Sequence, residues 1–406
     1  MSRRKGVLVT MKWLKKWLAA LLALALTALP AGAWETADQE AWEAVALSSL
    51  SDVEAHVGAA LLIERETGGC IYAYNEHARL APASVTKIMT LLLVMERIEA
   101  GLLALDQTVT CSAQAASMGG SQVYLEEGES MTVEELLKAV TVASGNDAAV
   151  ALAEEIAGSE GAFVELMNRR AAELGMADTV FANCTGLPAD SEHLTSAWDV
   201  GLMSRALLGH DLIRSYTTIW TDSLRDGAFG LANTNKLVRF YPGTTGLKTG
   251  FTPEAMHCLS ASAMRDGVEF IAVILHGESS DARFESAKLL LNHAFAGYTV
   301  ADALPDGALP PVAVTLGAKG YLQPELAGER RLLLEKSAAA GLRKELSLTE
   351  RVEAPVAAGQ ELGSLRILSA AGEELAVIPV VAPEAVPRLD WGHMLLRYLR
   401  LLTVGR

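Results

Sequence analysis

The stretch at residues 82–98, PASVTKIMTLLLVMERI, decides the fold that we expect for this chain. Residues 85–98 are largely apolar and contain neither glycine nor proline, which predicts a helix buried on most of its sides. The helix opens with a Ser-x-x-Lys pattern, and a separation of three residues places Lys87 one turn beyond Ser84 on the same face. The pattern is weak by itself, but its position at the start of an apolar helix makes Ser84 a candidate for chemistry.

Helices and strands alternate around this stretch, over residues 34–300. Two strand-like runs at 59–64 and 71–74 predict a hairpin, and the β-branched run at 269–275 predicts a central strand. Helical spacing recurs at residues 132–142, 148–157 and 162–174. Because strands lie at both ends of the segment, we expect one sheet closed by both ends, in an α/β (α+β) catalytic domain.

The composition changes near residues 301–311, where three prolines mark a linker. Beyond it, short strand-like runs are separated by turns that contain glycine, and they lie at residues 312–314, 331–334 and 375–380. This pattern predicts a small all-β domain over residues 305–386.

The last segment, residues 387–406, predicts an amphipathic helix. Arginines at 397 and 400 lie on one face of its helical wheel. The opposite face is apolar and consists of Trp391, Leu395, Tyr398 and Leu402. A cationic amphipathic helix at the end of an acidic protein is typical of an interfacial membrane anchor, so we expect peripheral membrane contact through residues 388–406. The alternative is a helix that packs on the β-domain.

The first segment, residues 1–33, has the parts of a secretory signal peptide. It holds six basic residues and no acidic one, an apolar run at 17–29 and small residues for cleavage at 30–33. The alternative is an uncleaved anchor, although the run is shorter than the roughly 20 residues that cross a bilayer. We therefore expect an exported protein on the outer face of the cytoplasmic membrane.

Charge and cysteine content exclude several functions. The 406-residue chain has a formal net charge of −15, and loss of the six basic residues of the leader takes it to −21, so no nucleic-acid partner is expected. The cysteines are widely spaced, without a Cys-x-x-Cys pair, which argues against a metal knuckle or a redox pair. We expect no metal and no other cofactor. Their pairing cannot be chosen from sequence, and we favour buried free thiols at Cys70, Cys111, Cys184 and Cys258.

Two further short patterns follow the Ser-x-x-Lys pair. Residues 144–146 (Ser-Gly-Asn) lie between two predicted helices, where their side chains can project from a turn, or where Ser144 or Asn146 can simply cap a helix. Residues 248–250 (Lys-Thr-Gly) predict a strand edge that the backbone of a substrate peptide can approach closely. The alternative is a strand entering a turn, with Lys248 in solvent.

Ser-x-x-Lys, Ser-x-Asn and Lys-Thr-Gly in this order are found in penicillin-binding proteins and class A β-lactamases. The chain resembles the serine-type D-Ala-D-Ala carboxypeptidases, the low-molecular-mass penicillin-binding proteins of peptidase family S11, closely over residues 37–300 and more loosely beyond. The resemblance is carried by residues 82–90, 143–149, 181–187, 233–237 and 246–252. It implies a serine β-lactamase/penicillin-binding-protein-like fold with an antiparallel sheet. It also implies removal of the terminal D-Ala from peptidoglycan stem peptides through an acyl-Ser84 intermediate, and covalent binding of β-lactams.

The resemblance implies roles for the first two patterns. Ser84 is the nucleophile, and Lys87 is its base, which requires a neutral amine and hence a pKa well below the usual ~10.4. Ser144 relays the proton toward the leaving amine, and Asn146 holds the substrate amide.

Recognition of a carboxylate is implied for the third pattern. Lys248 and Thr249 bind the terminal carboxylate of the peptide, Gly250 allows its close approach, and the charge of Lys248 helps to lower the pKa of the catalytic base. Arg283 stands where the family places a further carboxylate-binding arginine, and the alternative is an arginine on the surface.

Phe251 stands where many members of the family carry histidine after Lys-Thr-Gly. The resemblance implies an oxyanion hole made by the backbone N–H groups of Ser84 and Phe251, which this change leaves in place. Substrate preference near the site can differ as a result.

Three other functions remain open. A DD-endopeptidase or transpeptidase would use the same residues. A β-lactamase requires a positioned glutamate that activates water, and Gly145 in place of aspartate argues against class A. A non-catalytic wall-binding protein would carry a vestigial site, whereas all three patterns are intact in this sequence.

Overall fold

The computed structural model describes residues 50–304, 307–392 and 395. The predicted signal peptide and most of the predicted C-terminal helix lie outside these residues. Within the described ranges, none of the helices has both the length and the apolar character needed to cross a membrane.

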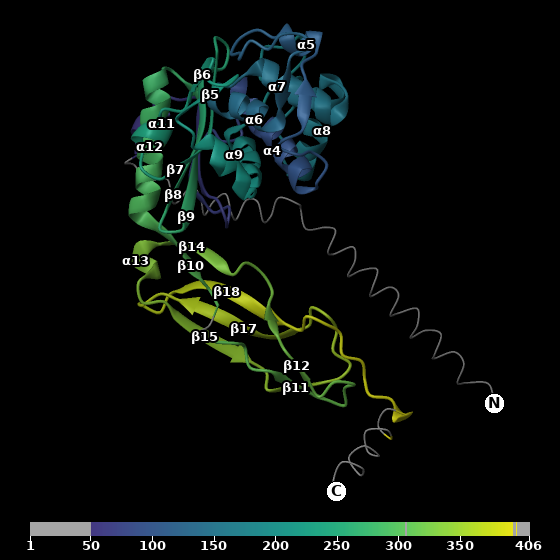
Figure 1. Ribbon diagram of the computed structural model, residues 1–406. Helices are drawn as coiled ribbons and strands as arrows, with labels where there is room; N and C mark the ends of the chain where they lie inside the picture. Colours follow the sequence, from purple (N-terminus) through teal and green to yellow (C-terminus); the bar gives the residue numbers. More distant parts are fainter. Residues whose placement is uncertain (1–49, 305–306, 393–394, 396–406) are drawn as a thin grey trace, which may run out of the picture. The chain divides into compact units, whose positions relative to one another are not determined.

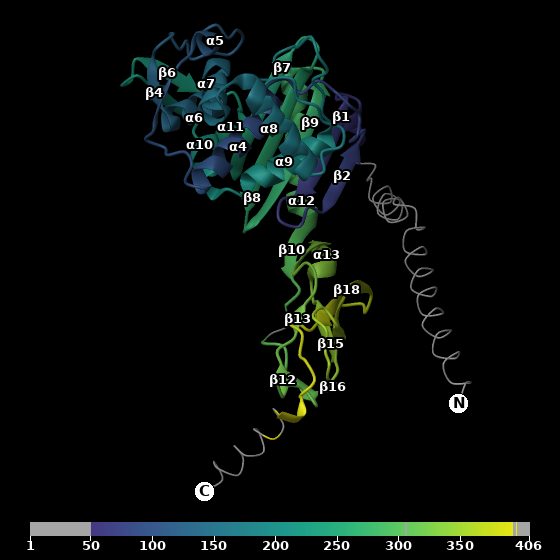
Figure 2. The ribbon, with the colours of Figure 1, turned by 90° about the vertical axis from the view of Figure 1, so that its right-hand side faces the viewer.

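One sheet of five antiparallel strands joins the two ends of the first part of the chain (Figures 1 and 2). Its order is β2-β1-β9-β8-β7, so that β1 pairs with the much later β9. The strands are β1 (Ala59–Glu64), β2 (Cys70–Tyr74), β7 (Thr244–Thr252), β8 (Met256–Arg265) and β9 (Val268–Gly277). The predicted hairpin, central strand and closure by both ends are confirmed.

Helices cover both faces of this sheet (Figure 1). On one face α12 (Ser280–Gly297) packs on β8 and β9, and on the other α9 (Ala197–Leu208) packs on β1 and β9. Residues 59–64 of β1 and 269–275 of β9 are buried throughout, because each strand is covered on both sides. This is why residues 59–63 and 270–275 are continuously apolar rather than alternating.

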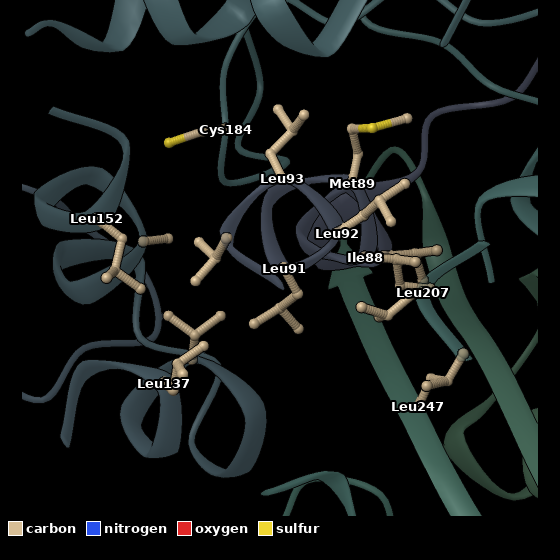
Figure 3. Close-up of a cluster of buried hydrophobic side chains, with 14 of the residues drawn as sticks. Ile88, Met89, Leu91, Leu92, Leu93, Leu137, Leu152, Cys184, Leu207 and Leu247 are labelled. Atoms are coloured by element: carbon tan, nitrogen blue, oxygen red, sulfur yellow. The ribbon is translucent and has the colours of Figure 1, made fainter. Parts of the chain in front are cut away.

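The buried helix α4 (Lys87–Glu99) lies at the centre of the helical part. Figure 3 shows its side chains directed to several sides, with Leu91 on the side of Leu137 and Leu152 and Ile88 beside Leu207. Ile88 and Leu91 are at most 1% exposed. The prediction of a helix buried on most of its sides is therefore confirmed.

The other elements of this part are mostly short. The helices are α3 (Ser51–Glu54), η2 (Ala83–Thr86), α5 (Ala113–Ala116), α6 (Val133–Val142), α7 (Asn146–Ala157), α8 (Glu160–Glu173), η3 (Asp211–Ile213), α10 (Arg214–Thr217) and α11 (Leu237–Phe240). Two strand pairs complete it, β3 (Thr108–Thr110) with β4 (Ser130–Thr132), and β5 (Thr221–Leu224) with β6 (Phe229–Ala232). The helices predicted at 132–142, 148–157 and 162–174 correspond to α6, α7 and α8.

The C-terminal part is built of strands, as predicted. Its sheets have the orders β10-β14, β12-β11-β16 and β13-β18-β17-β15. The strands are β10 (Tyr298–Asp302), β11 (Val312–Thr315), β12 (Tyr321–Leu322), β13 (Glu325–Leu326), β14 (Arg331–Glu335), β15 (Arg343–Leu348), β16 (Arg351–Glu353), β17 (Glu361–Leu368) and β18 (Glu374–Val381). The four-residue helix α13 (Lys336–Ala339) follows β14. Because β10 pairs with β14, this strand structure begins before the prolines of the expected linker.

All four cysteines lie in the described part, and all are free thiols. Cys111, Cys184 and Cys258 are buried, and Cys70 is partly buried. This agrees with the expectation of unpaired cysteines in a domain with a large core.

Candidate active site

Ser84 lies in the turn η2, directly before α4, and is half-buried. Two glycines from distant segments pack against this turn. A Cβ atom added at Gly186 would lie 1.7 Å from the carbonyl oxygen of Ala83, and one added at Gly250 would lie 3.0 Å from the backbone nitrogen of Ser84. Because only glycine permits so close an approach, the loop at Gly186 and the strand β7 can converge on Ser84.

The Lys87 ammonium lies within hydrogen-bond reach of Ser84, as the spacing of the pattern predicts. Its Nζ atom is 3.0 Å from Ser84 Oγ, 2.5 Å from Asn146 Oδ1 and 2.7 Å from the Thr185 carbonyl oxygen. The side chain is fully buried. In the neutral amine, two N–H bonds can serve Asn146 and Thr185, which leaves the lone pair directed at the Ser84 hydroxyl.

Burial lowers the pKa of Lys87 to about 7, against smaller opposing effects of Cys184 and Asp147. A substantial fraction of Lys87 is therefore neutral at physiological pH, which is the state that a general base requires. Burial is the main cause of the lowered pKa of Lys87. Burial also lowers the pKa of Lys248, and the charges of Lys87 and Arg283 lower it further. Because repulsion between two cations is mutual, the proximity of the two lysines favours loss of a proton from either one.

Ser144 lies in the turn between α6 and α7 and has a left-handed backbone, with φ of 63°. Its Oγ atom is buried and has no hydrogen-bond partner among the described residues. The N-cap residue of α7 is Gly145, and neither Ser144 nor Asn146 caps the helix with its side chain. The capping alternative is therefore wrong, and a buried hydroxyl without a partner is available to a reacting group.

Asn146 joins this turn to Lys87 and to a neighbouring loop. Its Oδ1 accepts from Lys87, and its Nδ2 donates to the carbonyl oxygen of Gly119 at 2.6 Å. The adjacent Asp147, 1% exposed, accepts from the backbone N–H groups of Val123 and Leu125 at 3.0 and 3.1 Å. This carboxylate therefore fixes the loop that faces the site.

The strand β7 forms the opposite wall, at the edge of the five-stranded sheet in the described part of the chain. Lys248 is 1% exposed and its Nζ donates to the Thr249 carbonyl oxygen at 3.0 Å, so the alternative of a solvated lysine is wrong. The ring of Phe251 is 57% exposed and stacks on His257, with centroids 4.5 Å apart. An edge strand with glycine at position 250 can accept the backbone of a peptide as a further strand.

Arg283, at the start of α12, is 8% exposed, so the alternative of a surface arginine is wrong. Its Nη1 donates to the carbonyl oxygens of Gly250 and Cys258, at 2.9 and 3.3 Å. Arg283 thereby contacts the backbone of β7 directly opposite the point where this strand approaches Ser84. Burial lowers its pKa without removing its charge.

Comparison with known protein families agrees with this arrangement. A family model described as D-alanyl-D-alanine carboxypeptidase matches residues 45–279, more than half of the chain. The chain belongs to the D-alanyl-D-alanine carboxypeptidase family. A second model, for the C-terminal domain of penicillin-binding protein 5, matches residues 324–388 in the β-structure.

Individual relatives extend over most of this chain. The D-alanyl-D-alanine carboxypeptidase DacF of Bacillus subtilis is 42% identical over 339 residues, 82% of this chain and 87% of the relative. Penicillin-binding protein 5 of Haemophilus influenzae has a TM-score of 0.74 at 25% identity, covering 82% of this chain and 98% of that one. Penicillin-binding protein D2 of Listeria monocytogenes, solved with ampicillin bound, has a TM-score of 0.54 at 30% identity and covers 59% of this chain and 97% of that one.

Three residues of this carboxypeptidase site were not identified from the sequence. Thr185 offers only its backbone carbonyl to Lys87, Asp147 acts through backbone N–H groups, and Thr234 lies 2.7 Å from the hydroxyl of Thr249. Thr185 and Thr234 lie within segments that carry the family resemblance, and Asp147 directly follows the Ser-Gly-Asn pattern. Their place in the sequence, next to the recognised patterns, was the one feature that could have identified them as site residues.

The pKa of Lys87 leads to a prediction for the pH dependence of the carboxypeptidase. A base with a pKa of about 7 is protonated and inactive below that pH, so the rate of acylation should rise through about pH 7 and level off above it. Buried His193, whose pKa is lowered to about 4, stays neutral over this range. The measurement is the second-order rate of acylation by benzylpenicillin between about pH 5.5 and 9. A rate that is constant across this range, or that rises only near pH 10, would show that Lys87 is not the titrating base.

Proposed function

We propose that this protein is a serine-type D-Ala-D-Ala carboxypeptidase that removes the terminal D-Ala from peptidoglycan stem pentapeptides and acts in cell-wall biogenesis. The observation that carries the proposal is the buried Lys87, with its lowered pKa, 3.0 Å from Ser84 Oγ and beside an edge strand. Family membership and the names of the relatives support the same reaction.

The reaction begins with transfer of the Ser84 proton to the neutral amine of Lys87. Ser84 Oγ then forms a bond to the carbonyl carbon of the penultimate D-Ala, and the backbone N–H groups of Ser84 and Phe251 stabilise the resulting oxyanion. The C–N bond breaks as the leaving amine takes up the proton that Lys87 carries. Ser144 is the proposed relay, which requires its unpartnered hydroxyl to turn toward Lys87 and the amine once the substrate is bound. Water then attacks the ester, with the same amine as base, and restores Ser84.

Substrate orientation follows from the charges on β7. The terminal carboxylate binds beside Lys248 and Thr249, and Arg283 of α12, which donates to the Gly250 carbonyl oxygen of the same strand, adds a third group. A peptide added antiparallel to β7 then extends past Phe251 toward Thr252. A pocket of about 300 Å³ lies at that end, between Thr252 and the loop at residues 186–194, and offers space for the preceding stem residues.

Labelling with benzylpenicillin separates the candidate functions. A β-lactam presents a strained amide to the same serine, and the carboxypeptidase proposal predicts a long-lived adduct on Ser84. Rapid turnover of the drug would indicate a β-lactamase, and absence of an adduct would indicate a non-catalytic protein. A DD-endopeptidase or transpeptidase would also be labelled, so the products formed from a pentapeptide must distinguish these from the carboxypeptidase.

We also propose export, followed by peripheral attachment to the membrane through residues 388–406. The sequence of this segment places four arginines against one aspartate, whereas the mature protein is strongly acidic. At its start, Trp391 is 85% exposed and Leu395 is 62% exposed. The apolar face can enter the acyl boundary while the arginines contact lipid phosphates.

Deletion of residues 388–406 should release the protein from anionic vesicles and leave its activity on small peptides unchanged, because the deleted segment contains none of the site residues. The measurement is co-sedimentation of the mature chain with vesicles that contain about 30% anionic lipid. A truncated protein that still sediments, or a mature protein that never does, would contradict the anchor.

A further inference from the structure

The segment Asn233-Thr234-Asn235, which carries part of the family resemblance, lies beside the carboxylate-binding strand. Thr234 is exposed, whereas the asparagines on either side are buried, Asn233 at 6% and Asn235 at 1% exposure. The two buried side chains therefore hold the segment in place and direct the threonine outward.

Hydrogen bonds join this segment to the Ser-Gly-Asn turn on one side of the site and to β7 on the other. The backbone N–H of Thr234 donates to the carbonyl oxygen of Val142 at 3.1 Å, two residues before Ser144. Asn235 Nδ2 donates to the carbonyl oxygen of Gly246 at 2.9 Å, two residues before Lys248. Asn233 Nδ2 donates to the carbonyl oxygen of Ile219 at 2.7 Å. Thr234 thus occupies a fixed position between the Ser-Gly-Asn turn and β7.

The hydroxyl of Thr234 lies 2.7 Å from that of Thr249. In the free enzyme Thr249 donates to Thr234, and a hydroxyl has only one proton to donate. A carboxylate accepts hydrogen bonds and donates none, so Thr249 must turn its proton to the substrate when the peptide binds. Thr234 can then reverse its role and donate to Thr249 Oγ1, which strengthens the bond that Thr249 makes to the anion.

We propose that Thr234 is a specificity-determining positioning residue that favours substrates ending in a free carboxylate over those ending in a neutral amide. This inference rests on the proposed role of Thr249 in carboxylate binding. Thr234 acts through Thr249, and the two hydroxyls form a chain that ends on the anion. The charge of the carboxylate makes this chain more favourable than the same chain ending on an amide.

The test compares a D-Ala-D-Ala peptide with its C-terminal amide in the wild type and in Thr234→Val, Thr234→Ser and Thr110→Val. The valine variant keeps the shape of threonine without the hydroxyl, and the serine variant keeps the hydroxyl. Thr110 is a matched control, because it is exposed and its hydroxyl lies 3.1 Å from that of Ser130, away from the site.

We expect Thr234→Val to lose about tenfold in kcat/KM on the free acid, mainly through KM, and at most about threefold on the amide. Thr234→Ser and Thr110→Val should behave as the wild type does. Equal losses on acid and amide, no loss on the acid, or a serine variant as impaired as the valine variant would each overturn the inference. D-Ala release by the wild type tests the proposed function separately, because it does not depend on the acid-to-amide ratio of the variants.

If Thr234→Val does not fold, acylation by benzylpenicillin and by its methyl ester in Thr234→Ser and Thr234→Ala supplies the same comparison. The inference predicts that the alanine variant loses preference for the free acid and that the serine variant keeps it. Retention of the wild-type preference by both variants would contradict it.

Discussion

Alanine in place of Ser84 is expected to abolish both D-Ala release and formation of the penicillin adduct. The hydroxyl is the atom that forms the acyl bond, and the structure places no other hydroxyl against the Lys87 amine in its described residues. The loss should be about 10⁴-fold or more, as for removal of a nucleophile in other serine hydrolases. The measurements are D-Ala release from a pentapeptide and intact-protein mass after incubation with benzylpenicillin.

The matched control for this change is Ser223→Ala, which removes an exposed hydroxyl on β5. It should retain full activity, and the thermal midpoint of both variants should stay close to that of the wild type because Ser84 is only half-buried. An Ser84→Ala protein that still gains the mass of the drug would show that the nucleophile is another residue.

Replacement of Lys87 by alanine is expected to lower acylation by about 10²- to 10⁴-fold, the range for loss of a general base. The nucleophile remains, but no amine accepts its proton. Because Lys87 is fully buried and holds Asn146 and Thr185, the change also leaves a cavity, so stability must be measured alongside the rate. The measurement is the acylation rate at about pH 8, where the wild-type base is mostly neutral.

The control variant Lys288→Ala removes a partly exposed lysine from α12, where it pairs with Glu285. It should acylate at the wild-type rate. If Lys87→Ala is folded and still acylates rapidly at neutral pH, the role of Lys87 as base is wrong.

Much of the catalytic domain could be predicted from its sequence because its decisive features are local. Residues 85–98 are largely apolar, and a helix at the centre of a domain buries such a segment on most of its sides. The Ser-x-x-Lys spacing is also local, since the geometry of one turn brings Lys87 to Ser84.

The contacts that complete the site depend on packing between distant segments. Lys87 meets Asn146 and Thr185 across 59 and 98 residues, and Arg283 meets Gly250 across 33. The burial of Lys248 and Arg283, and hence the direction of their pKa shifts, follows from how α12 and η2 close on β7. The periodicity of the sequence does not show that Lys248 and Arg283 are buried. From the sequence alone, each could therefore also be a residue on the surface.

The C-terminal part illustrates the same limit. Short runs separated by glycine-containing turns predicted strands, but strand order depends on tertiary pairing, as in the parallel pair of β11 with β16. The pairing of β10 with β14 could not be predicted from the sequence either, because the two strands lie on either side of the expected linker.

Carboxypeptidase activity is best tested by mass spectrometry of a stem pentapeptide ending in D-Ala-D-Ala after incubation with the mature protein. We expect a tetrapeptide and free D-Ala in equal amounts, with no product in the Ser84→Ala variant. An unchanged pentapeptide, or cleavage at any bond other than the one between the two D-alanines, would contradict this expectation.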